Sequence, residues 1–229
     1  MRTLFRCFVL VALLSWMTVG VWGCSAQPTN NQSSGTPDGG TNPDSSGTNQ
    51  CVGVDPTETG GAWNPETPKA CEGKPGSCVG SPMPNWTLKD FQPQSCGFEK
   101  KYGIRAFRGK VTVLVLLASW CGFCQMQIEK LERMRLELSS QGKDVNFVVV
   151  NQEDAVDTQK EFVDRSGIPL FQDTAEAKVF AMQGGGKDDM FVYNSKGFLV
   201  KYLPFSGDVD INLSGEGYNN LKKAIESAE

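Results

Sequence analysis

Two neighbouring stretches in the middle of the chain carry the clearest hydrophobic patterns. Residues 111–118 read VTVLVLLA, with no charged position, and such a run predicts a strand that is buried on both faces. The stretch that follows has apolar residues at steps of three and four, which form one face of a helix starting near Gln125. The residues on this face are Cys124, Ile128, Leu131, Met134 and Leu138. The sequence therefore predicts a buried strand that turns directly into an amphipathic helix.

The remainder of the C-terminal part alternates between the two periodicities. A second apolar run at 145–150 predicts another strand, and residues 190–193 and 198–203 predict a hairpin around Asn194-Ser195-Lys196-Gly197. The other predicted elements are helices at 157–165, at 174–182 with Thr174 as the cap, and at 218–227, and an extended piece at 168–171. This order predicts an α/β fold with a central mixed β-sheet flanked by helices.

The N-terminus has the pattern of an export signal. Arg2 and Arg6 precede an apolar run from residue 8 to residue 22, which is short for a membrane-spanning helix. The run ends in Val21-Trp22-Gly23-Cys24, which resembles the cleavage box of bacterial lipoproteins, although Trp22 stands where a small residue is usual. We therefore predict a signal peptide at 1–23 and lipidation of Cys24. The alternative is cleavage near Ala26, which would leave a soluble exported protein.

Composition divides the remaining chain into three parts. Residues 24–50 are rich in Ser, Gly, Asn and Pro with almost no apolar side chain, so we expect a disordered, flexible tether. Residues 51–82 keep the Gly and Pro but add three cysteines, which indicates a loop-rich lead-in held by crosslinks. From residue 83 to residue 229 the composition is that of a packed domain, with Trp86 as an expected core residue.

Charge and cysteine content limit the partners. Without residues 1–23 the chain has 20 basic against 26 acidic residues, and it has no basic run, so nucleic acid is not an expected partner. Four cysteines outside the other motifs form an even set in an exported chain: Cys51, Cys71, Cys78 and Cys96. They predict two structural disulfides, with three connectivities left open. A four-cysteine metal site is the alternative, but the spacing lacks the close pairs of such sites, and we expect no metal and no cofactor.

The candidate chemistry lies at the predicted turn from strand to helix, where Cys121 and Cys124 form a C-x-x-C pair. Two cysteines at this spacing suit a reversible disulfide, and the free N–H groups of a helix's first turn favour a thiolate. The thiolate is the nucleophile of disulfide exchange. Half of a zinc site and a structural disulfide are the alternatives, but the chain has no histidine to complete a zinc site.

With this motif at the end of the first strand, residues from about 84 to 228 resemble the thioredoxin-like superfamily, including membrane-tethered bacterial lipoproteins. A narrower resemblance is to the N-terminal domain of selenoprotein P. The stretches that carry it are Ala118-Ser119, Val148-Val149-Val150-Asn151, Lys187-Asp188-Asp189, Phe191-Val192-Tyr193, Gly197, Leu199-Val200 and Leu203-Pro204-Phe205-Ser206. The resemblance implies a thioredoxin-like fold in which Cys121 occupies the position of the family's selenocysteine and Cys124 that of the second redox residue.

One loop departs from ordinary thioredoxins, which place a cis-proline opposite the redox motif. The matching residues 186–190 contain no proline and offer Asp188 and Asp189 instead. They form either a simple polar turn or a site in which one carboxylate faces the sulfurs and accepts the proton of Cys124. A carboxylate near a thiol raises its pKa, which helps proton transfer but opposes nucleophilicity.

These features predict a thiol–disulfide oxidoreductase of the bacterial cell envelope that acts through a mixed disulfide. Trp120, Gly122 and Phe123 would shape the surface around the nucleophile. The alternatives are a thiol peroxidase, which the selenoprotein P resemblance implies, and a binding lipoprotein without catalysis. The expected partners are protein disulfides or hydroperoxides, a thiol reductant and, through the lipid, a membrane.

Overall fold

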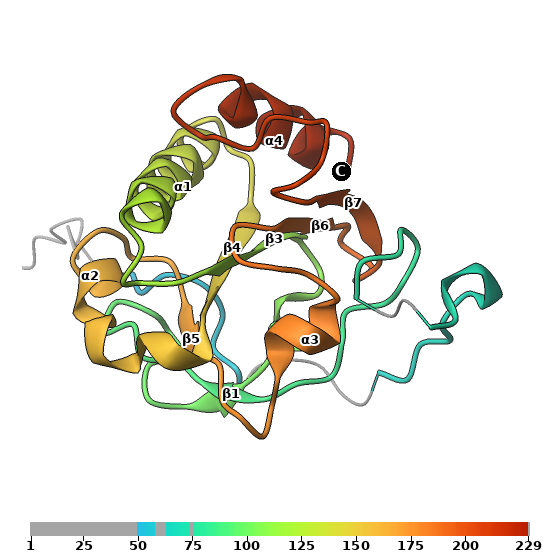
Figure 1. The fold of residues 1–229 in the computed structure, drawn as a ribbon, viewed down its shortest axis with the longest axis horizontal. Helices are drawn as coiled ribbons and strands as arrows, with labels where there is room; N and C mark the ends of the chain where they lie inside the picture. Colours follow the sequence, from blue (N-terminus) through green and yellow to red (C-terminus); the bar gives the residue numbers. More distant parts are fainter. Residues whose placement is uncertain (1–49, 58–62, 74–75, 229) are drawn as a thin grey trace, which may run out of the picture. The chain divides into compact units, whose positions relative to one another are not determined.

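A computed structural model describes residues 50–57, 63–73 and 76–228, so the predicted signal peptide, Cys24 and the tether lie outside the described residues, apart from Gln50. A five-stranded mixed sheet in the order β5-β4-β3-β6-β7 forms the centre of this part (Figure 1). Its strands are β3 (Val111–Leu117), β4 (Val145–Asn151), β5 (Leu170–Gln172), β6 (Met190–Tyr193) and β7 (Leu199–Leu203). The predicted α/β fold is confirmed.

β3 is the central strand of the sheet, and all seven of its residues are buried. It runs parallel to β4, with Val111 opposite Val145, and antiparallel to β6, with Val115 opposite Met190. A strand with neighbours on both edges and cover on both faces has no solvent-facing position, and this explains its nearly continuous apolar sequence. The redox motif lies directly after the carboxyl end of β3, so this central strand fixes its position.

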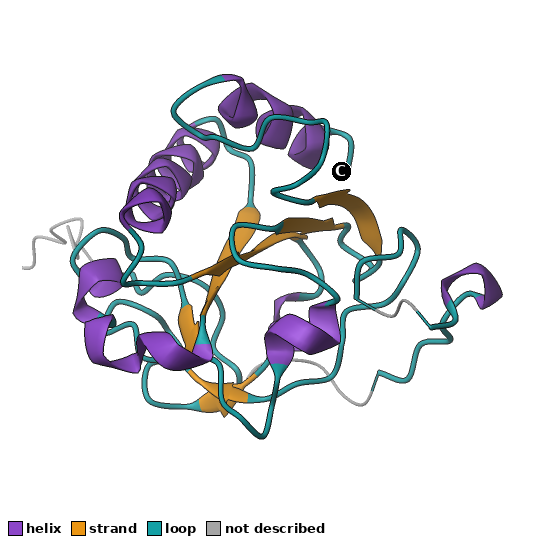
Figure 2. Cartoon of the chain, viewed as in Figure 1, coloured by secondary structure: helices purple, strands orange, loops and turns teal. Residues whose placement is uncertain are grey.

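The two faces of the sheet are covered by different elements, as Figure 2 shows by the distribution of helices and loops. Alternate β3 residues such as Val113 and Val115 pack in one cluster with helix α1 (Gly122–Ser140) and helix α4 (Glu216–Glu226). Leu114 and Leu116 point to the other face and pack with aromatic side chains. The second cluster includes Trp86, Tyr102, Phe107, Phe171, Phe191 and Tyr193. The expectation that Trp86 belongs to the core is confirmed.

Two predicted helices are shorter than expected. The helix at 157–165 is a 3₁₀ helix η3 (Glu153–Thr158) followed by the single turn α2 (Lys160–Val163). The helix predicted from Thr174 is wrong at its start, because α3 spans Val179–Gln183. The carboxylate of Asp173 accepts the N–H groups of Val179 and Phe180, at 2.9 and 3.1 Å, so a side chain six residues upstream begins this helix.

Two disulfides involve the lead-in, in which the 3₁₀ turn η1 (Lys69–Cys71) is the regular element among the described residues. Cys71 pairs with Cys78 within the lead-in, and Cys51 pairs with Cys96 of the packed domain. Backbone hydrogen bonds lie beside the Cys51–Cys96 disulfide. Val52 N–H donates to Gln94 O, and Cys96 N–H donates to Val52 O, both at 2.9 Å. The start of the lead-in is therefore attached to the domain by covalent and backbone bonds.

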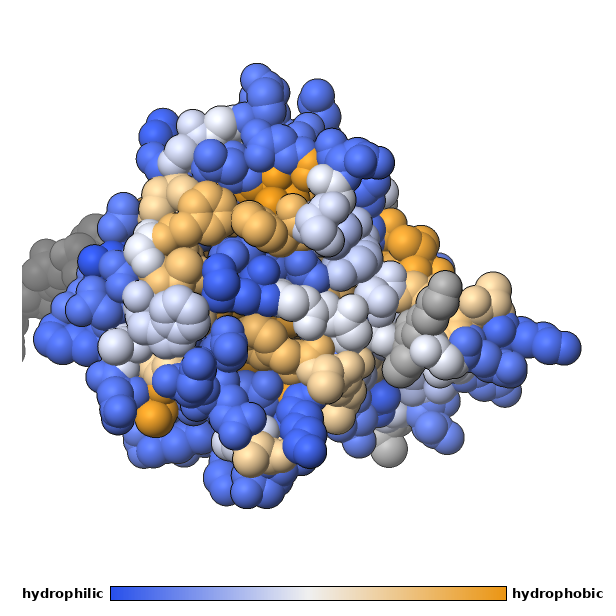
Figure 3. Space-filling view, viewed as in Figure 1, coloured by the Kyte–Doolittle hydropathy of each residue, from blue (hydrophilic) through white to orange (hydrophobic). Residues whose placement is uncertain are grey.

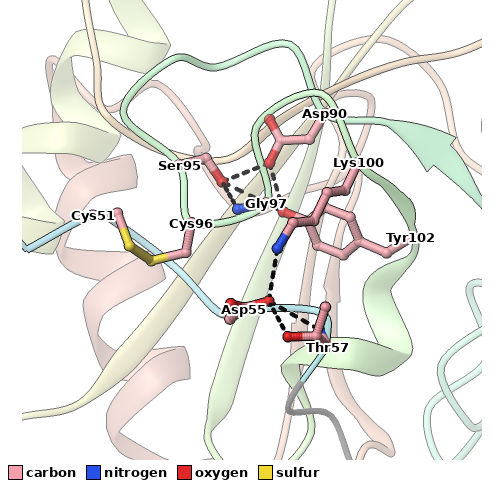
Figure 4. Close-up of a disulfide and its surroundings, with 9 residues drawn as sticks. All are labelled: Cys51, Asp55, Thr57, Asp90, Ser95, Cys96, Gly97, Lys100 and Tyr102. Atoms are coloured by element: carbon pink, nitrogen blue, oxygen red, sulfur yellow. Dashed lines mark hydrogen bonds and ion pairs between the residues drawn. A yellow bond between two sulfur atoms is a disulfide. The ribbon is translucent and has the colours of Figure 1, made fainter.

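Beside that disulfide a buried carboxylate organises the loop between β1 (Leu88–Lys89) and β2 (Lys101–Tyr102). Figure 4 shows Ser95 and Tyr102 pointing at Asp90, and their hydroxyl groups donate to its carboxylate at 2.6 and 2.5 Å. Burial raises the pKa of Asp90, while these two hydrogen bonds act against the rise. Cys96, the residue after Ser95, forms the disulfide with Cys51. The hydrogen bonds of Ser95 and Tyr102 to Asp90 therefore fix the point at which the lead-in is attached.

Candidate active site

The redox motif begins on a turn that neighbouring side chains hold in place. Ser119 N–H donates to Asn151 Oδ1 at 2.9 Å, and Ser119 Oγ donates to Ala155 O at 2.9 Å. The turn closes with a bond from Cys121 N–H to Ala118 O at 2.9 Å. Cys121 is the residue that caps α1, with extended backbone angles, and Gly122 opens the helix. The turn therefore presents Cys121 at the free N–H groups of a 19-residue helix, where its dipole favours a negative charge.

Cys121 and Cys124 are free thiols in the structure and differ in exposure. Cys121 is partly exposed, whereas Cys124 lies in the first turn of α1 and is fully buried. Partial burial acts to raise the pKa of Cys121, but the N–H and S–H groups of Cys124 and the Lys187 ammonium outweigh it, so this pKa lies below its usual value. Burial, followed by the Asp188 carboxylate, raises the pKa of Cys124 well above its usual value, although the backbone at Ala118 acts in the opposite direction.

Asp188 lies against the inner sulfur. The Cys124 S–H donates to Asp188 Oδ1 at 3.0 Å, and only 1% of Asp188 is exposed. Its backbone has a φ of +76°, in the left-handed region that non-glycine residues rarely adopt, and its N–H donates to Leu116 O at 2.6 Å. The segment is a turn, and within it the carboxylate of Asp188 is buried and points at a thiol. The role of Asp188 as proton acceptor stays a prediction.

Asp189 does not reach the sulfurs. Its Oδ2 accepts the N–H of Gly186 at 2.8 Å and the hydroxyl of Tyr202 at 2.6 Å, and its Oδ1 accepts the N–H of Phe205 at 2.7 Å. Burial and then the Asp189 carboxylate raise the pKa of Tyr202. Asp189 thus ties the loop to β7 and to the segment after it, and Asp188 is the member of the pair that the structure brings to Cys124.

Lys187 was not identified as a site residue from the sequence, although its ammonium is the second charged side-chain group at the sulfurs, beside the Asp188 carboxylate. Its ammonium Nζ lies 3.6 Å from Cys121 Sγ and 3.8 Å from Cys124 Sγ, and it forms an ion pair with Asp188 Oδ2. Burial acts to lower the pKa of Lys187, but Asp188 and the two sulfurs outweigh it and raise this pKa. Nothing in the spacing of the sequence indicates this contact, since 63 positions separate Lys187 from Cys124.

The residues within and beside the motif differ in what they contribute to its surface. Trp120 is 48% exposed, and its indole N–H donates to Asp154 Oδ1 at 3.1 Å. Phe123 packs edge-on against Phe205, which is itself exposed, with 6.1 Å between ring centroids. A side chain at Gly122 would meet no atom within 4 Å, so packing does not require glycine there. Figure 3 shows one face of the molecule, on which hydrophobic residues form separate patches with hydrophilic residues between them.

The four other described cysteines are bound in the two disulfides, so none of them is a free thiol. Among the described residues no group of three or more His, Cys, Asp or Glu side chains could hold a metal ion. Within the same ranges no helix has the length and hydropathy needed to cross a membrane. The chemical groups at the site are therefore one thiol with a lowered pKa, one thiol with a raised pKa, one carboxylate and one ammonium.

Known structures and sequences resemble this chain over the same region. Its structure superposes on a candidate thiol:disulfide interchange protein DsbE from Chlorobium tepidum with a TM-score of 0.53 and 17% identity, over 66% of this chain and 98% of the other. A candidate protein disulfide isomerase from Bacteroides thetaiotaomicron gives a TM-score of 0.51 and 22% identity, over 66% and 90% of the two chains. These likenesses identify the fold as thioredoxin-like.

Selenoproteins are among the sequence relatives of this chain. Selenoprotein P of Bos taurus is 29% identical over 132 residues, which are 54% of this chain and 30% of the relative. Selenoprotein Pb of Danio rerio is 30% identical over 139 residues, or 57% and 49% of the two chains. The chain thus spans less than half the length of these two relatives. The model of the family "Selenoprotein P, N terminal region" matches residues 75–207. This range includes the redox motif and the acidic loop (residues 186–190). The chain therefore belongs to that family.

Proposed function

We propose that this protein is a thiol–disulfide oxidoreductase that uses Cys121 as nucleophile and Cys124 as resolving thiol. The observation that carries the proposal is the difference between the two sulfurs. Cys121 is partly exposed and has a lowered pKa, whereas Cys124 is buried, has a raised pKa and donates to Asp188. An accessible thiolate beside a protonated inner thiol is the arrangement that a two-step exchange needs.

The reaction proceeds in two displacements. The Cys121 thiolate attacks one sulfur of a substrate disulfide, forms a mixed disulfide and releases the other substrate sulfur as a thiolate. Cys124 then passes its proton to the Asp188 carboxylate and attacks Cys121 Sγ, which releases the second substrate sulfur as a thiolate. The substrate has gained two electrons, and the protein is left with a Cys121–Cys124 disulfide that a thiol reductant must open. The 3.0 Å contact between Cys124 Sγ and Asp188 Oδ1 supports this direction of proton transfer.

A thiol peroxidase is the second candidate, and membership of the selenoprotein P family favours it. In this reaction the Cys121 thiolate attacks a hydroperoxide and becomes a sulfenic acid, while the other oxygen leaves as an alcohol or water after taking up a proton. Cys124 condenses with the sulfenic acid, water is lost, and the same disulfide results. Both candidates require a thiol reductant to restore the two thiols.

The deciding experiment compares two substrates under one reductant. Purified chain is supplied with a thiol donor and either insulin or hydrogen peroxide, and turnover is measured for the wild type and for Cys121→Ser. Faster reduction of insulin, abolished in the variant, supports the oxidoreductase, and faster consumption of peroxide supports the peroxidase. Rates that are equal in the wild type and Cys121→Ser for both substrates refute both candidates and leave the binding lipoprotein.

We also propose that the chain acts outside the cytoplasm, on a lipid anchor at Cys24. The features that support this are the predicted signal peptide at 1–23, the polar tether at 24–50 and the two disulfides of the attached region. Metabolic labelling with a fatty acid, compared between the wild type and Cys24→Ser, tests the anchor. Label that persists in Cys24→Ser would contradict it, and a mature N-terminus near Ala26 would indicate a soluble exported form instead.

A further inference from the structure

Lys187 lies at the point where the charges of the site meet. Its ammonium is within 4 Å of both sulfurs and forms an ion pair with Asp188. The two members of the ion pair differ in exposure, because 31% of the Lys187 side chain is accessible but only 1% of Asp188. The ammonium therefore lies between a buried carboxylate and the sulfur that is open to substrate.

We propose that Lys187 is a further catalytic residue, whose ammonium stabilises the Cys121 thiolate before attack and the Cys124 thiolate during resolution. The proposal rests on the proposed thiol chemistry of this site, for either a disulfide or a hydroperoxide substrate. It rests on contact, since Nζ touches the sulfur that carries the charge at each stage. A cation within about 4–6 Å of an acid favours its ionised form.

The contacts also explain how one ammonium can serve both sulfurs in turn. In the resting reduced protein the charge of Lys187 is shared between the Asp188 carboxylate and the Cys121 thiolate. When Cys124 passes its proton to Asp188, that carboxylate becomes neutral, and the ammonium is left facing the sulfurs alone. The proton transfer itself thus directs the charge of Lys187 towards the new thiolate. The charged groups that face the sulfurs are Lys187 and Asp188 from the loop, and the polar backbone groups are the first N–H groups of α1 and the backbone at Ala118.

A merely structural role for Lys187 makes a different prediction. If the ammonium only neutralised the buried Asp188, its removal would destabilise the loop without changing the acidity of Cys121. The substitution Lys187→Met alone would also leave a buried carboxylate unpaired, which complicates its interpretation. The double variant Lys187→Met/Asp188→Asn removes both charges, and its comparison with Asp188→Asn isolates the ammonium.

The experiment measures alkylation of Cys121 by iodoacetamide against pH in the reduced full chain. Cys121 and Cys124 lie on the same tryptic peptide, residues 111–130, so tandem mass spectrometry of this peptide is used to assign the label to Cys121. We expect the midpoint to rise by about one pH unit when Lys187→Met is added to the wild type or to Asp188→Asn. Lys187→Arg keeps the charge and is expected to restore the wild-type midpoint, and Asp188→Asn alone is expected not to raise it.

The redox potential provides a second readout. Loss of thiolate stabilisation favours the Cys121–Cys124 disulfide, so Lys187→Met shifts the thiol–disulfide equilibrium by up to about tenfold, or about 30 mV towards a more reducing protein. An unchanged alkylation midpoint in both backgrounds overturns the proposal, and so does a rise that Lys187→Arg fails to reverse. Alkylation needs no substrate, so this result is independent of the insulin and peroxide assays that test the proposed function.

Discussion

Asp188→Asn is the substitution that most directly tests the proton acceptor. Asparagine has the shape of aspartate and tolerates the left-handed backbone at this position, but it cannot accept a proton. Two unit charges 3.0 Å apart repel by roughly 5 kcal/mol at an effective dielectric of about 20, which is why the Cys124 thiolate is opposed by an ionised Asp188. The substitution removes that repulsion, while burial of the thiol remains and Lys187 already offsets part of the charge. We therefore expect the pKa of Cys124 to fall by about 1–3 pH units.

The rate of resolution should nevertheless decrease. A positioned general base contributes about 10²–10⁴ in rate, and the lower pKa of Cys124 recovers part of the loss, so we expect resolution to slow about 100-fold. A chromogenic aromatic disulfide separates the two steps, because attack by Cys121 releases one coloured thiolate and resolution by Cys124 releases the second. In Asp188→Asn the first phase should keep its rate and the second should slow. Cys124→Ala, as the control, should show the first phase alone.

Two results would refute this reasoning. Equal rates of the second phase in the wild type and Asp188→Asn would mean that water, rather than Asp188, accepts the proton. Equal slowing of both phases would mean that the substitution distorts the loop rather than removing a base. Asp189→Asn serves as the matched variant, because its carboxylate binds Tyr202 and Phe205 and does not touch the sulfurs. It is expected to lower stability while leaving the ratio of the two phases unchanged.

Three further predictions concern stability, measured by chemical denaturation of the oxidised chain. Tyr102→Phe removes the 2.5 Å bond to the buried Asp90 and should lower the free energy of unfolding by about 1.5–3 kcal/mol; an unchanged denaturation midpoint would show that the bond is not needed. Replacing Cys51 and Cys96 by Ser opens a crosslink across 45 residues, for which chain entropy gives about 4 kcal/mol, and a loss below about 1 kcal/mol would contradict it. Gly122→Ala meets no neighbouring atom and opens α1, so it should stabilise by up to about 1 kcal/mol with turnover retained, and destabilisation would refute this.

The parts of the fold that could be predicted are those in which one segment's own pattern decides its environment. The run at 111–117 has no charged residue and only one polar residue, Thr112, and it forms the central strand. The start of α3 could not be predicted, because the Asp173 side chain caps it from six residues away and Lys178 adopts a φ of +48° between them. Local propensity at Thr174 was overridden by a more distant acceptor.

The same distinction holds for the site. Cys121 and Cys124 are recognisable because their chemistry depends on two positions on one turn. The contacts of Lys187 and Asp188 with them depend on where the loop crosses the end of β3, which spacing does not encode. The pairing of the lead-in cysteines was open for a similar reason, since three connectivities satisfy the spacing and the fold brings Cys51 to Cys96. Sequence therefore predicts functional groups that lie on one element. The structure is needed to find groups from distant segments that the fold brings into contact.

The absence of proline from the acidic loop has a geometric cause. The loop pairs with β3 through two bonds, from Asp188 N–H to Leu116 O at 2.6 Å and from Leu116 N–H to Asp189 O at 3.0 Å. Proline at position 188 would lack the first N–H, and its ring fixes φ near −65°, whereas this position needs +76°. At position 189 it would remove the N–H that binds Gly186 O at 3.2 Å. A loop that turns a carboxylate onto Cys124 in this way cannot also hold proline at either position. The acidic loop is thus an alternative to a proline loop, in which hydrogen bonds to Leu116 replace a rigid ring and a carboxylate is placed against Cys124.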